Sequence, residues 1–363
     1  MERESGSDKN GCGRSQANKY GIEVHVKRLC GSALLSGLLV FLFISAGCST
    51  PADTRIDAVP DEELPVFLSN LSQVSDYPFY TAEYRWDYGF DAYIESGEYP
   101  VNQFDEVLAD ACTCFYVAGG EDGPLLGRNF DWHEHPALLL FTYPPDGFAS
   151  VSMVDISYLG YDDTHSPMDD PAGLFYAPYY AFDGMNEHGL AVGMMAVGHA
   201  EGELNPEKIT LDSLELIRLI LDRARDVDDA LDLLDDYNVE FGSVPLHYLV
   251  ADAHGGSVII EFLDDELLVI EGENEWQTAA NFIISEVRPA GADAPCWRYN
   301  HVESELSVAD GKIDSKEAMD LLEAVSQDGN MGTRWSTIYH LEDAAISVAI
   351  NRNFQRVYAF DIE

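Results

Sequence analysis

A thiol, a cation and a carboxylate lie close together in one stretch of the sequence. Cys112-Thr113-Cys114 is followed, sixteen residues after its first cysteine, by Arg128-Asn129-Phe130-Asp131-Trp132. A cysteine serves as a nucleophile when a base withdraws its proton and a nearby positive charge stabilises the thiolate. Cys112 is therefore a candidate nucleophile, and Arg128 is a candidate source of that charge.

No histidine lies at a spacing from Cys112 that would predict it as the base for this thiol. The histidines considered are His133, His135, His188 and His247. A cut of the peptide bond between Ala111 and Cys112 supplies a base in another way, because the freed α-amino group titrates at about pH 7.7–8.0 and can accept the proton. The competing interpretation is a core cysteine beside a surface Arg-Asp pair, since free cysteines are often simply buried.

The same segment contains residues of the kinds that bind zinc. Cys112, Cys114, His133 and His135 offer two thiolates and two imidazoles. The C-x-C and H-x-H pairs are closer than typical zinc spacings, and strand alternation places each pair on one side of a sheet. A surface loop before Pro136 is the simpler interpretation of the two histidines. We therefore expect neither a metal nor another cofactor.

Turn signals around the cysteine predict a β-hairpin. A strand with Cys112, the turn Gly119-Gly120-Glu121-Asp122-Gly123 and a strand through Leu125-Leu126-Gly127-Arg128 would bring the thiol beside the cation. Short runs bounded by turn residues predict further strands. All the expected strands are 112–117, 125–129, 137–142, 149–157, 181–183, 190–197, 246–252, 257–263, 266–271, 278–284, 336–340, 345–351 and 356–360.

Apolar residues at three- and four-residue spacing predict helices between these strands. The expected helices are 211–225, 227–237, one from about Trp297, 315–327, and a short one from Pro60 to about Val74. An aromatic-rich segment, 77–99, is expected to pack against a core. Runs of strands, then a helical pair, then more strands indicate an α+β layered domain rather than alternating βαβ units.

The charge balance excludes one class of partner. The chain has 65 acidic against 20 basic side chains, for a formal net charge of −45. Such a chain repels polyanions, so nucleic acid binding is excluded. Solubility is the plain interpretation of so acidic a surface. A salty habitat is a hypothesis that extends it, and it requires stability to rise with salt over the molar range.

The first part of the chain has the order of an export signal. Lys27 and Arg28 precede a short apolar run, 34–46, which is too short to favour a stable membrane span. Ser45-Ala46-Gly47-Cys48 looks like a bacterial lipobox, whose cysteine becomes lipidated; an ordinary signal peptide that ends at Gly47 is the alternative. We expect an exported protein that is lipid-anchored to the cell envelope through Cys48.

Three cysteines remain in the body of the chain. They are Cys112, Cys114 and Cys296. A bond between Cys112 and Cys114 would be strained at a separation of two residues. A disulfide between Cys114 and Cys296 is left open by the sequence.

Several strings along the chain resemble one enzyme family, the choloylglycine hydrolases and penicillin V acylases. These are N-terminal nucleophile hydrolases that cleave linear amides, and acid ceramidase-like amidases are more distant relatives. The resemblance runs from Cys112 to nearly Glu363 in order and approximate spacing. The matching strings are Cys112-Thr113, Gly127-Arg128-Asn129, Asp131-Trp132, Asp183-Gly184-Met185-Asn186-Glu187, Gly189-Leu190, Leu246-His247-Tyr248, Asp252, Gly256-Ser257, Glu261, Asn281 and Arg298.

The resemblance implies a role for each of five residues. Cys112 would be the nucleophile and supply its own base, and Arg128 would organise the thiolate. Asp131 would hold the α-amino group, Asn281 would donate to the oxyanion, and Arg298 would complete the polar network. An amide donor aimed at a developing oxyanion is worth about 2.7–4 kcal/mol of barrier.

The resemblance also implies the fold and the domain organisation. The fold would be a four-layer αββα sandwich over residues 112–363, after a lipoprotein signal peptide at 1–47 and a tether with an N-terminal pro-segment at 48–111. Exposure of Cys112 would then require an internal cut after Ala111, for which self-cleavage by the thiol is the simpler hypothesis. One position departs from the family: Ala196 stands where bile salt hydrolases carry a second asparagine of the oxyanion site.

The implied reaction is hydrolysis of a non-peptide linear amide, of the bile-amide, penicillin V or N-acyl amine type, through a thioester acyl-enzyme. The partner would be a small-molecule acyl amide, with a membrane contact through the lipid anchor only; a homo-oligomer is compatible with the sequence. Two alternatives stay open: an acyltransferase of the penicillin-forming type, and a non-catalytic ligand-binding lipoprotein of the same fold.

Overall fold

The computed structural model of the chain describes residues 26–28, 70–96, 111–120, 122–242, 244–287 and 294–362. Cys48 and the expected tether lie outside these residues, as does most of the expected signal peptide. Within the described ranges, no helix combines the length and the apolar character needed to cross a membrane.

The larger of the two main sheets has ten strands. Its strands pair antiparallel except for β3 and β6, which run parallel. In spatial order they are β1 (Val26–Arg28), β14 (Glu266–Glu271), β13 (Ser257–Leu263), β12 (Leu246–Ala251), β9 (Ala191–Ala196), β8 (Ala181–Asn186), β7 (Ser150–Asp155), β6 (Ala137–Thr142), β3 (Phe79–Tyr84) and β2 (Ser72–Ser75).

The smaller main sheet has six antiparallel strands and carries the candidate nucleophile on the second strand from one edge. In spatial order they are β15 (Trp276–Ala280), β4 (Ala111–Gly120), β5 (Gly123–Trp132), β16 (Gly332–His340), β17 (Ala345–Ile350) and β18 (Val357–Asp361). A separate parallel pair consists of β10 (Ile209–Asp212) and β11 (Tyr237–Glu240).

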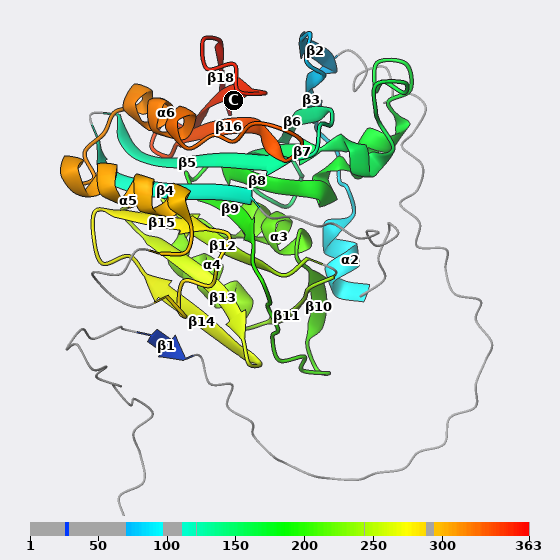
Figure 1. The fold of residues 1–363 in the computed structure, drawn as a ribbon. Coiled ribbons are helices and arrows are strands. Elements are labelled where there is room, and N and C mark those ends of the chain that lie inside the picture. The colour runs from blue at the N-terminus through cyan, green and yellow to red at the C-terminus, as the bar shows by residue number, and fades with distance from the viewer. Residues whose placement is uncertain are drawn as a thin grey trace, which may run out of the picture.

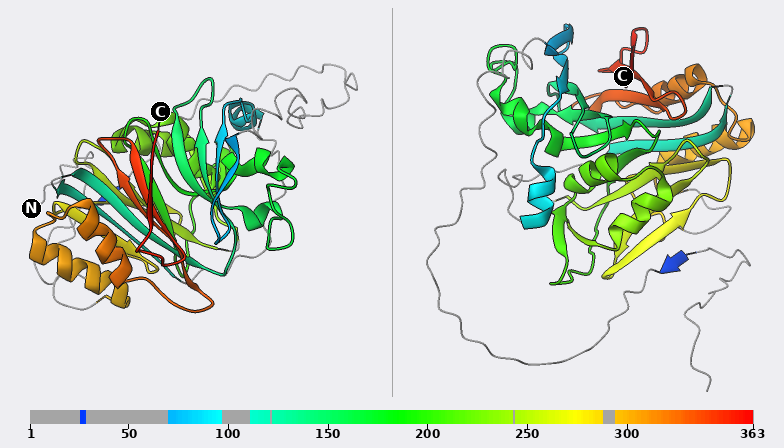
Figure 2. Two further views of the ribbon diagram at one scale, coloured as in Figure 1. Left: turned by 90° about the horizontal axis from the view of Figure 1, so that it is seen from above. Right: turned by 180° about the vertical axis from the view of Figure 1, so that it is seen from behind.

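The helices cover the outer faces of the two sheets (Figure 1). They are α2 (Phe90–Ser96), α3 (Glu215–Arg223), α4 (Val227–Leu234), α5 (Trp297–Ala309) and α6 (Ser315–Ala324), with short 3₁₀ segments η1 (Ile156–Leu159) and η2 (Ala172–Tyr180). Helix α3 packs on β8 and β9 of the larger sheet, whereas α5 and α6 pack on the smaller sheet. The sheets pack on each other where β4 meets β9 and β12. This α+β sandwich, seen from two more sides in Figure 2, confirms the expected αββα fold.

The predicted hairpin that positions the thiol is β4 and β5. Cys112 lies opposite Phe130, and Cys114 lies opposite Arg128. Because side chains alternate along a strand, Arg128 shares the inner face of the sheet with the two cysteines, while Asp131 points to the outer face beneath the helices. Gly127 fits only as glycine, since a Cβ there would lie 2.4 Å from the ring of Phe115.

Three predicted helix boundaries are wrong because strands occupy those residues, and the helix expected at 315–327 ends at Ala324. Residues 72–75, at the end of the expected helix from Pro60, form strand β2; residues 60–69 lie outside the described ranges. The helix expected at 211–225 begins at Glu215, because residues 209–212 pair with β11 and the Asp212 carboxylate caps the helix by accepting from the Leu214 and Glu215 amides. The helix expected at 227–237 ends at Leu234 for the same reason, since Tyr237 begins β11.

The folded unit extends upstream of Cys112. Strand β3 lies in the larger sheet, where Phe79 and Ala82 are buried. Helix α2 is tied to α3 by a hydrogen bond of 2.7 Å from the Tyr93 hydroxyl to Glu215 and by an Asp91–Arg223 ion pair. Residues 70–96 are therefore part of the layered domain, although we expected the domain to begin at residue 112.

The disulfide that the sequence left open is not formed. Cys114 is buried between the sheets as a free thiol, and Cys296 is free and half-buried before α5. Burial raises the pKa of the Cys114 thiol to about 12, so this thiol is protonated at neutral pH.

Candidate active site

The thiol of Cys112 is buried inside the protein. Its side chain is 2 % exposed, and its sulfur lies 3.9 Å from Nη2 of Arg128. Burial raises the pKa of the Cys112 thiol; Arg128 and a hydrogen bond from the Asp131 backbone amide oppose this effect, and the carboxylate of Asp131 adds to it. In the uncut chain the thiol is therefore protonated at neutral pH.

Arg128 is held by a carboxylate of the larger sheet. Its Nε donates to Oδ2 of Asp183 at 2.7 Å, and both side chains are fully buried. Asp183 also accepts from Nε1 of Trp335 at 3.0 Å and from the hydroxyl of Tyr339. Nη1 of Arg128 donates to the carbonyl of Met194. The guanidinium is thus fixed on two sides, with Nη2 directed at the sulfur.

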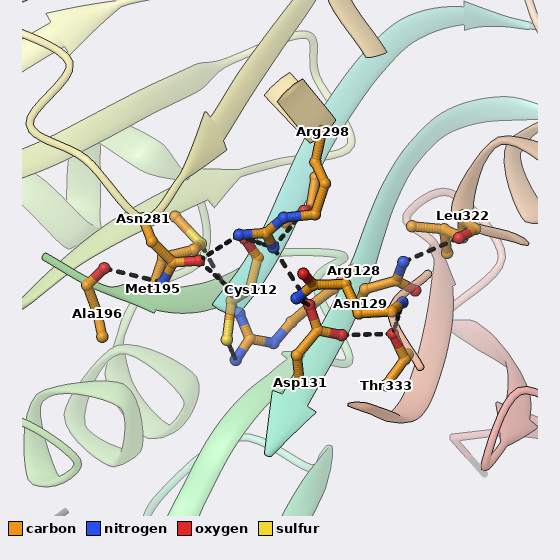
Figure 3. A network of polar contacts seen from close by, with 12 residues as sticks. Cys112, Arg128, Asn129, Asp131, Met195, Ala196, Asn281, Arg298, Leu322 and Thr333 are labelled. Atoms are coloured by element: carbon orange, nitrogen blue, oxygen red, sulfur yellow. Dashed lines mark hydrogen bonds and ion pairs between the residues drawn. The ribbon is translucent and has the colours of Figure 1, made fainter. Parts of the chain in front are cut away.

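Arg298, at the start of α5, connects four groups around Cys112 (Figure 3). Its Nη1 donates to the Cys112 carbonyl at 2.6 Å, to Oγ1 of Thr113 at 2.9 Å and to Oδ2 of Asp131 at 3.2 Å. Its Nη2 donates to Oδ1 of Asn281 at 2.9 Å. Arg298 therefore sets the position of the Cys112 backbone rather than that of its sulfur.

Asn281, the first residue after β15, contacts the Cys112 backbone nitrogen through its side-chain oxygen. Oδ1 accepts from the backbone N–H of Cys112 and from Arg298, and Nδ2 donates to the carbonyl of Ala196 at 2.9 Å. Only this orientation of the amide satisfies both sides, because its neighbours are donors at one end and an acceptor at the other. The position that departs from the family, Ala196, thus contributes its backbone to the site.

Asp131 lies on the outer face, where it accepts three side-chain hydrogen bonds. They come from Arg298, from Nε2 of Gln327 at 2.8 Å and from the hydroxyl of Thr333. Burial raises the pKa of Asp131, and these hydrogen bonds oppose the effect. The expected role of Asp131 was to hold the Cys112 amino group; in the uncut chain the nitrogen of Cys112 is bonded by Asn281 instead.

The residues weighed as zinc ligands are separated. Cys112 and Cys114 are buried between the sheets, whereas His133 is exposed and the Nδ1 atom of His135 is 2.7 Å from the carbonyl of His133. In the part of the chain that the structure describes, no three cysteine, histidine or acidic side chains gather as a metal site would require.

Four side chains of the site were not foreseen as site residues. They are Thr113, Asp183, Gln327 and Thr333. Thr113 and Asp183 lie inside the strings that resemble the family, so this resemblance was the available signal for both. Gln327 and Thr333 lie far along the chain from Asp131, and no spacing connects them.

Chemically, this arrangement can stabilise a thiolate and hold a backbone. Within the described residues, the sulfur of Cys112 has Arg128 and the Asp131 amide as partners, and both are donors that cannot take its proton. A base must therefore come from a change in the chain, such as a free amino group at Cys112.

The chain is similar to a known family and to solved structures of hydrolases. The family described as linear amide C-N hydrolases, choloylglycine hydrolase family, matches residues 112–281. Conjugated bile acid hydrolase from Clostridium perfringens has 15% sequence identity and a TM-score of 0.51, over 69% of this chain and 92% of that chain. Penicillin V acylase from Agrobacterium tumefaciens has 17% identity and a TM-score of 0.50, over 69% of this chain and 86% of that one. No curated protein sequence matches the chain.

The α+β sandwich has the fold of these two solved structures. The match of residues 112–281 to the choloylglycine hydrolase family of linear amide C–N hydrolases confirms the resemblance found in the sequence.

Proposed function

We propose that this protein is an exported amidohydrolase that uses Cys112 as its nucleophile on a non-peptide linear amide. The observation that carries the proposal is the convergence of three side chains on one cysteine. Arg128 faces its sulfur, Asn281 binds its nitrogen and Arg298 binds its carbonyl. A buried structural cysteine has no need of two arginines, because each brings a charge that must be desolvated.

Activity requires a cut between Ala111 and Cys112. In the uncut chain burial raises the pKa of the thiol, and the nitrogen of Cys112 is an amide that cannot act as a base. The cut converts it to an α-amino group with a pKa of about 7.7–8.0, within reach of its own thiol. The Cys112 thiol itself is the proposed agent of the cut.

The reaction then proceeds in two steps. The Cys112 sulfur attacks the amide carbonyl while its proton passes to the amino group, and the C–N bond breaks as that proton is delivered to the leaving amine. A thioester forms. Water attacks the thioester with the amino group again as base, the C–S bond breaks, and the acid leaves with the thiol restored.

Asn281 is the proposed donor to the oxyanion that forms in both steps. An amide nitrogen carries two N–H groups, and Ala196 accepts from only one of them. The second N–H is the proposed oxyanion contact. Loss of such a donor typically costs about 2.7–4 kcal/mol of transition-state stabilisation.

The proposed substrate joins an apolar acyl group to a polar amine. Conjugated bile acid hydrolase and penicillin V acylase, the structural relatives, are named for substrates of this kind. Bile amides, phenoxyacetyl penicillins and N-acyl amines are therefore the substrates to test.

The decisive experiment compares wild type and Cys112→Ala on a panel of these amides. We expect turnover of at least one amide by wild type, with release of acid and amine in equal amounts, and none by the variant. Intact-mass analysis of the active protein should show a chain that begins at Cys112. Turnover by a chain that is wholly uncut, or turnover that survives Cys112→Ala, would overturn the mechanism.

The same panel separates hydrolysis from acyl transfer. Added amine should leave the yield of free acid unchanged for a hydrolase, whereas an acyltransferase would form the new amide at the expense of the acid. A protein that binds the amides in its native form and never turns them over would instead be a ligand-binding lipoprotein.

We also propose export with lipidation of Cys48, on the basis of the apolar run and the small residues before this cysteine. Cells fed labelled palmitate should label the segment that begins at Cys48, and Cys48→Ala should abolish the label and release this segment from membranes. Label that survives in Cys48→Ala would refute this site of attachment.

A further inference from the structure

The loop that begins with Asn281 is anchored by a carboxylate from the opposite sheet. Glu261 on β13 is fully buried. Its Oε1 accepts from the backbone N–H of Ile284 at 2.6 Å, and its Oε2 accepts from that of Ser285 at 3.1 Å. These two amides follow Asn281 by three and four residues, so Glu261 fixes the loop shortly after the residue that contacts the nucleophile.

A histidine completes this anchor. Nδ1 of His247, on β12, lies 3.1 Å from Oε1 of Glu261, and both side chains are fully buried. Burial would raise the pKa of Glu261, but the hydrogen bonds from His247, Ser285 and Ile284 outweigh it and lower the pKa. Glu261 is therefore ionised at neutral pH, and hydrogen bonds to a charged acceptor are about twice as strong as neutral ones.

Glu261 and His247 lie in the part of the larger sheet that also binds the Asn281 side chain through Ala196. His247 pairs with Met195, and its neighbour Leu246 pairs with Ala196, the residue whose carbonyl accepts from Asn281. The Met195 sulfur in turn lies 3.7 Å from Nη1 of Arg128. A continuous row of contacts thus leads from the arginine at the thiol to the carboxylate that holds the Asn281 loop.

Apolar packing adds a third tie but does not orient Asn281. Ile283 packs with Val197 and Leu263 in a small buried cluster. Such contacts are not directional, whereas two hydrogen bonds to one carboxylate fix both the position and the rotation of the loop.

We propose that Glu261, with His247 behind it, is a positioning residue that aims the Asn281 side chain at the reacting carbonyl. This inference rests on the proposed role of Asn281 as oxyanion donor. Glu261 touches neither the thiol nor the substrate; it acts through the backbone of residues 284 and 285.

The first test is the kinetics of Glu261→Gln. The glutamine side chain keeps one acceptor oxygen but turns its NH₂ group toward the backbone N–H of Ile284 or Ser285. The loop after Asn281 therefore shifts, while the Cys112 thiol stays in place. We expect kcat to fall by about 10–100-fold, the size of effect that a misplacement of about 1 Å produces. KM should stay within about threefold, because Asn281 acts on the transition state rather than on the bound substrate.

Asp252→Asn is the matched control. Asp252 follows β12 at the far end of the same two strands, and its carboxylate accepts from the backbone amides of Val227, His254 and Gly256. The control variant should lose a comparable amount of thermal stability and keep its kcat. Equal loss of kcat in the two variants would mean that Glu261 matters only for folding, and the proposal would be overturned.

A double-mutant cycle tests whether Glu261 acts through Asn281. In the Asn281→Ala background, Glu261→Gln should reduce kcat by less than about threefold, because the group that it positions is already gone. Additive losses would overturn the proposal. If Glu261→Gln does not fold, Glu261→Asp keeps the charge, shortens the reach to the two amides, and enters the same cycle.

A failure of the positioning role of Glu261 can be distinguished from a failure of the proposed amidohydrolase function. If wild type turns over no amide, the proposed function fails before the variants are compared. If wild type is active and Asn281→Ala is impaired while Glu261→Gln keeps full kcat, only the positioning role of Glu261 is lost.

Discussion

Strand β5 carries a buried ion pair on each of its two faces, and the two pairs are built differently. On the inner face, between the sheets, Arg128 binds Asp183 at 2.7 Å with both side chains fully buried. On the outer face, beneath the helices, Asp131 binds Arg298 at 3.2 Å, with a few per cent of the Arg298 side chain exposed. Both pairs meet at Cys112, one at its sulfur and one at its backbone (Figure 3).

The partners of each arginine explain the difference. Arg128 has a single carboxylate, which Trp335 and Tyr339 hold in place. Arg298 shares its donors among Asp131 and three neutral acceptors, on Cys112, Thr113 and Asn281. In the inner pair, the guanidinium of Arg128 lies beside the thiol and lowers its pKa. In the outer pair, Arg298 donates to several acceptors and holds the backbone of Cys112 in place.

The largest expected effect follows from the concentration of charge on the inner face. Asp183→Asn leaves the guanidinium of Arg128 buried without a charge partner, which typically costs about 3–5 kcal/mol. Asp131→Asn leaves Arg298 with its neutral acceptors and should cost about 1–3 kcal/mol. Chemical denaturation of the Cys112→Ala protein measures both without interference from catalysis. The reverse order of the two losses would contradict the comparison.

The second prediction separates the arginines by the reactivity of the thiol. Arg128 lowers the pKa of Cys112 more than Arg298 does, so Arg128→Gln should raise the pKa of Cys112 and slow its alkylation at neutral pH by about tenfold or more. Arg298→Gln should change alkylation much less while still impairing amide turnover. Mass spectrometry of the Cys112 peptide after timed iodoacetamide treatment gives both rates.

A matched check on folding accompanies that measurement. Thermal melts of the two arginine variants should show folded protein at the alkylation temperature. Equal slowing of alkylation in folded Arg128→Gln and Arg298→Gln would mean that the two faces do not divide their tasks.

Local pattern accounts for most of the fold. The strands at 137–142, 257–263 and 266–271 have the predicted bounds, because alternation and turn residues are encoded within each segment. The errors at 209–212 and 237–240 share one cause. These segments pair with each other across the intervening helices, and apolar spacing within either one does not reveal a distant partner.

The site divides in the same way. The hairpin brings Arg128 to Cys112 through local turn chemistry alone, and the resemblance to a family pointed to Asn281 and Arg298. Gln327 and Thr333 reach Asp131 from 196 and 202 residues away, through a packing of α6 and β16 that no local signal specifies. Their side chains are common types at unremarkable spacings, so only the folded structure identifies them.

The third prediction concerns the direction in which the Asp131 carboxylate shifts the pKa of Cys112. The charge of Asp131 raises the pKa of the Cys112 thiol, so Asp131→Asn should lower that pKa and speed alkylation. Amide turnover should nevertheless fall, because the Arg298 network loses its carboxylate. A variant that only loosens the fold would also alkylate faster, because unfolding exposes the thiol. Thermal melts must therefore show that Asp131→Asn is folded at the alkylation temperature.

The smallest expected effect tests how widely the outer network is shared. Gln327→Ala removes one of three side-chain donors to Asp131, which is about 0.5–1.5 kcal/mol of stability for a hydrogen bond of this kind. Thr333→Val removes another donor with little change in shape and should cost a similar amount. Alkylation of Cys112 should stay within about twofold of wild type in both variants, because Arg128 and Asp183 on the inner face are untouched. Denaturant titration and the same peptide mass spectrometry measure the two quantities.

A large change in alkylation from either substitution would mean that the outer face controls the thiol as directly as the inner one, since Gln327 and Thr333 reach the sulfur only through Asp131.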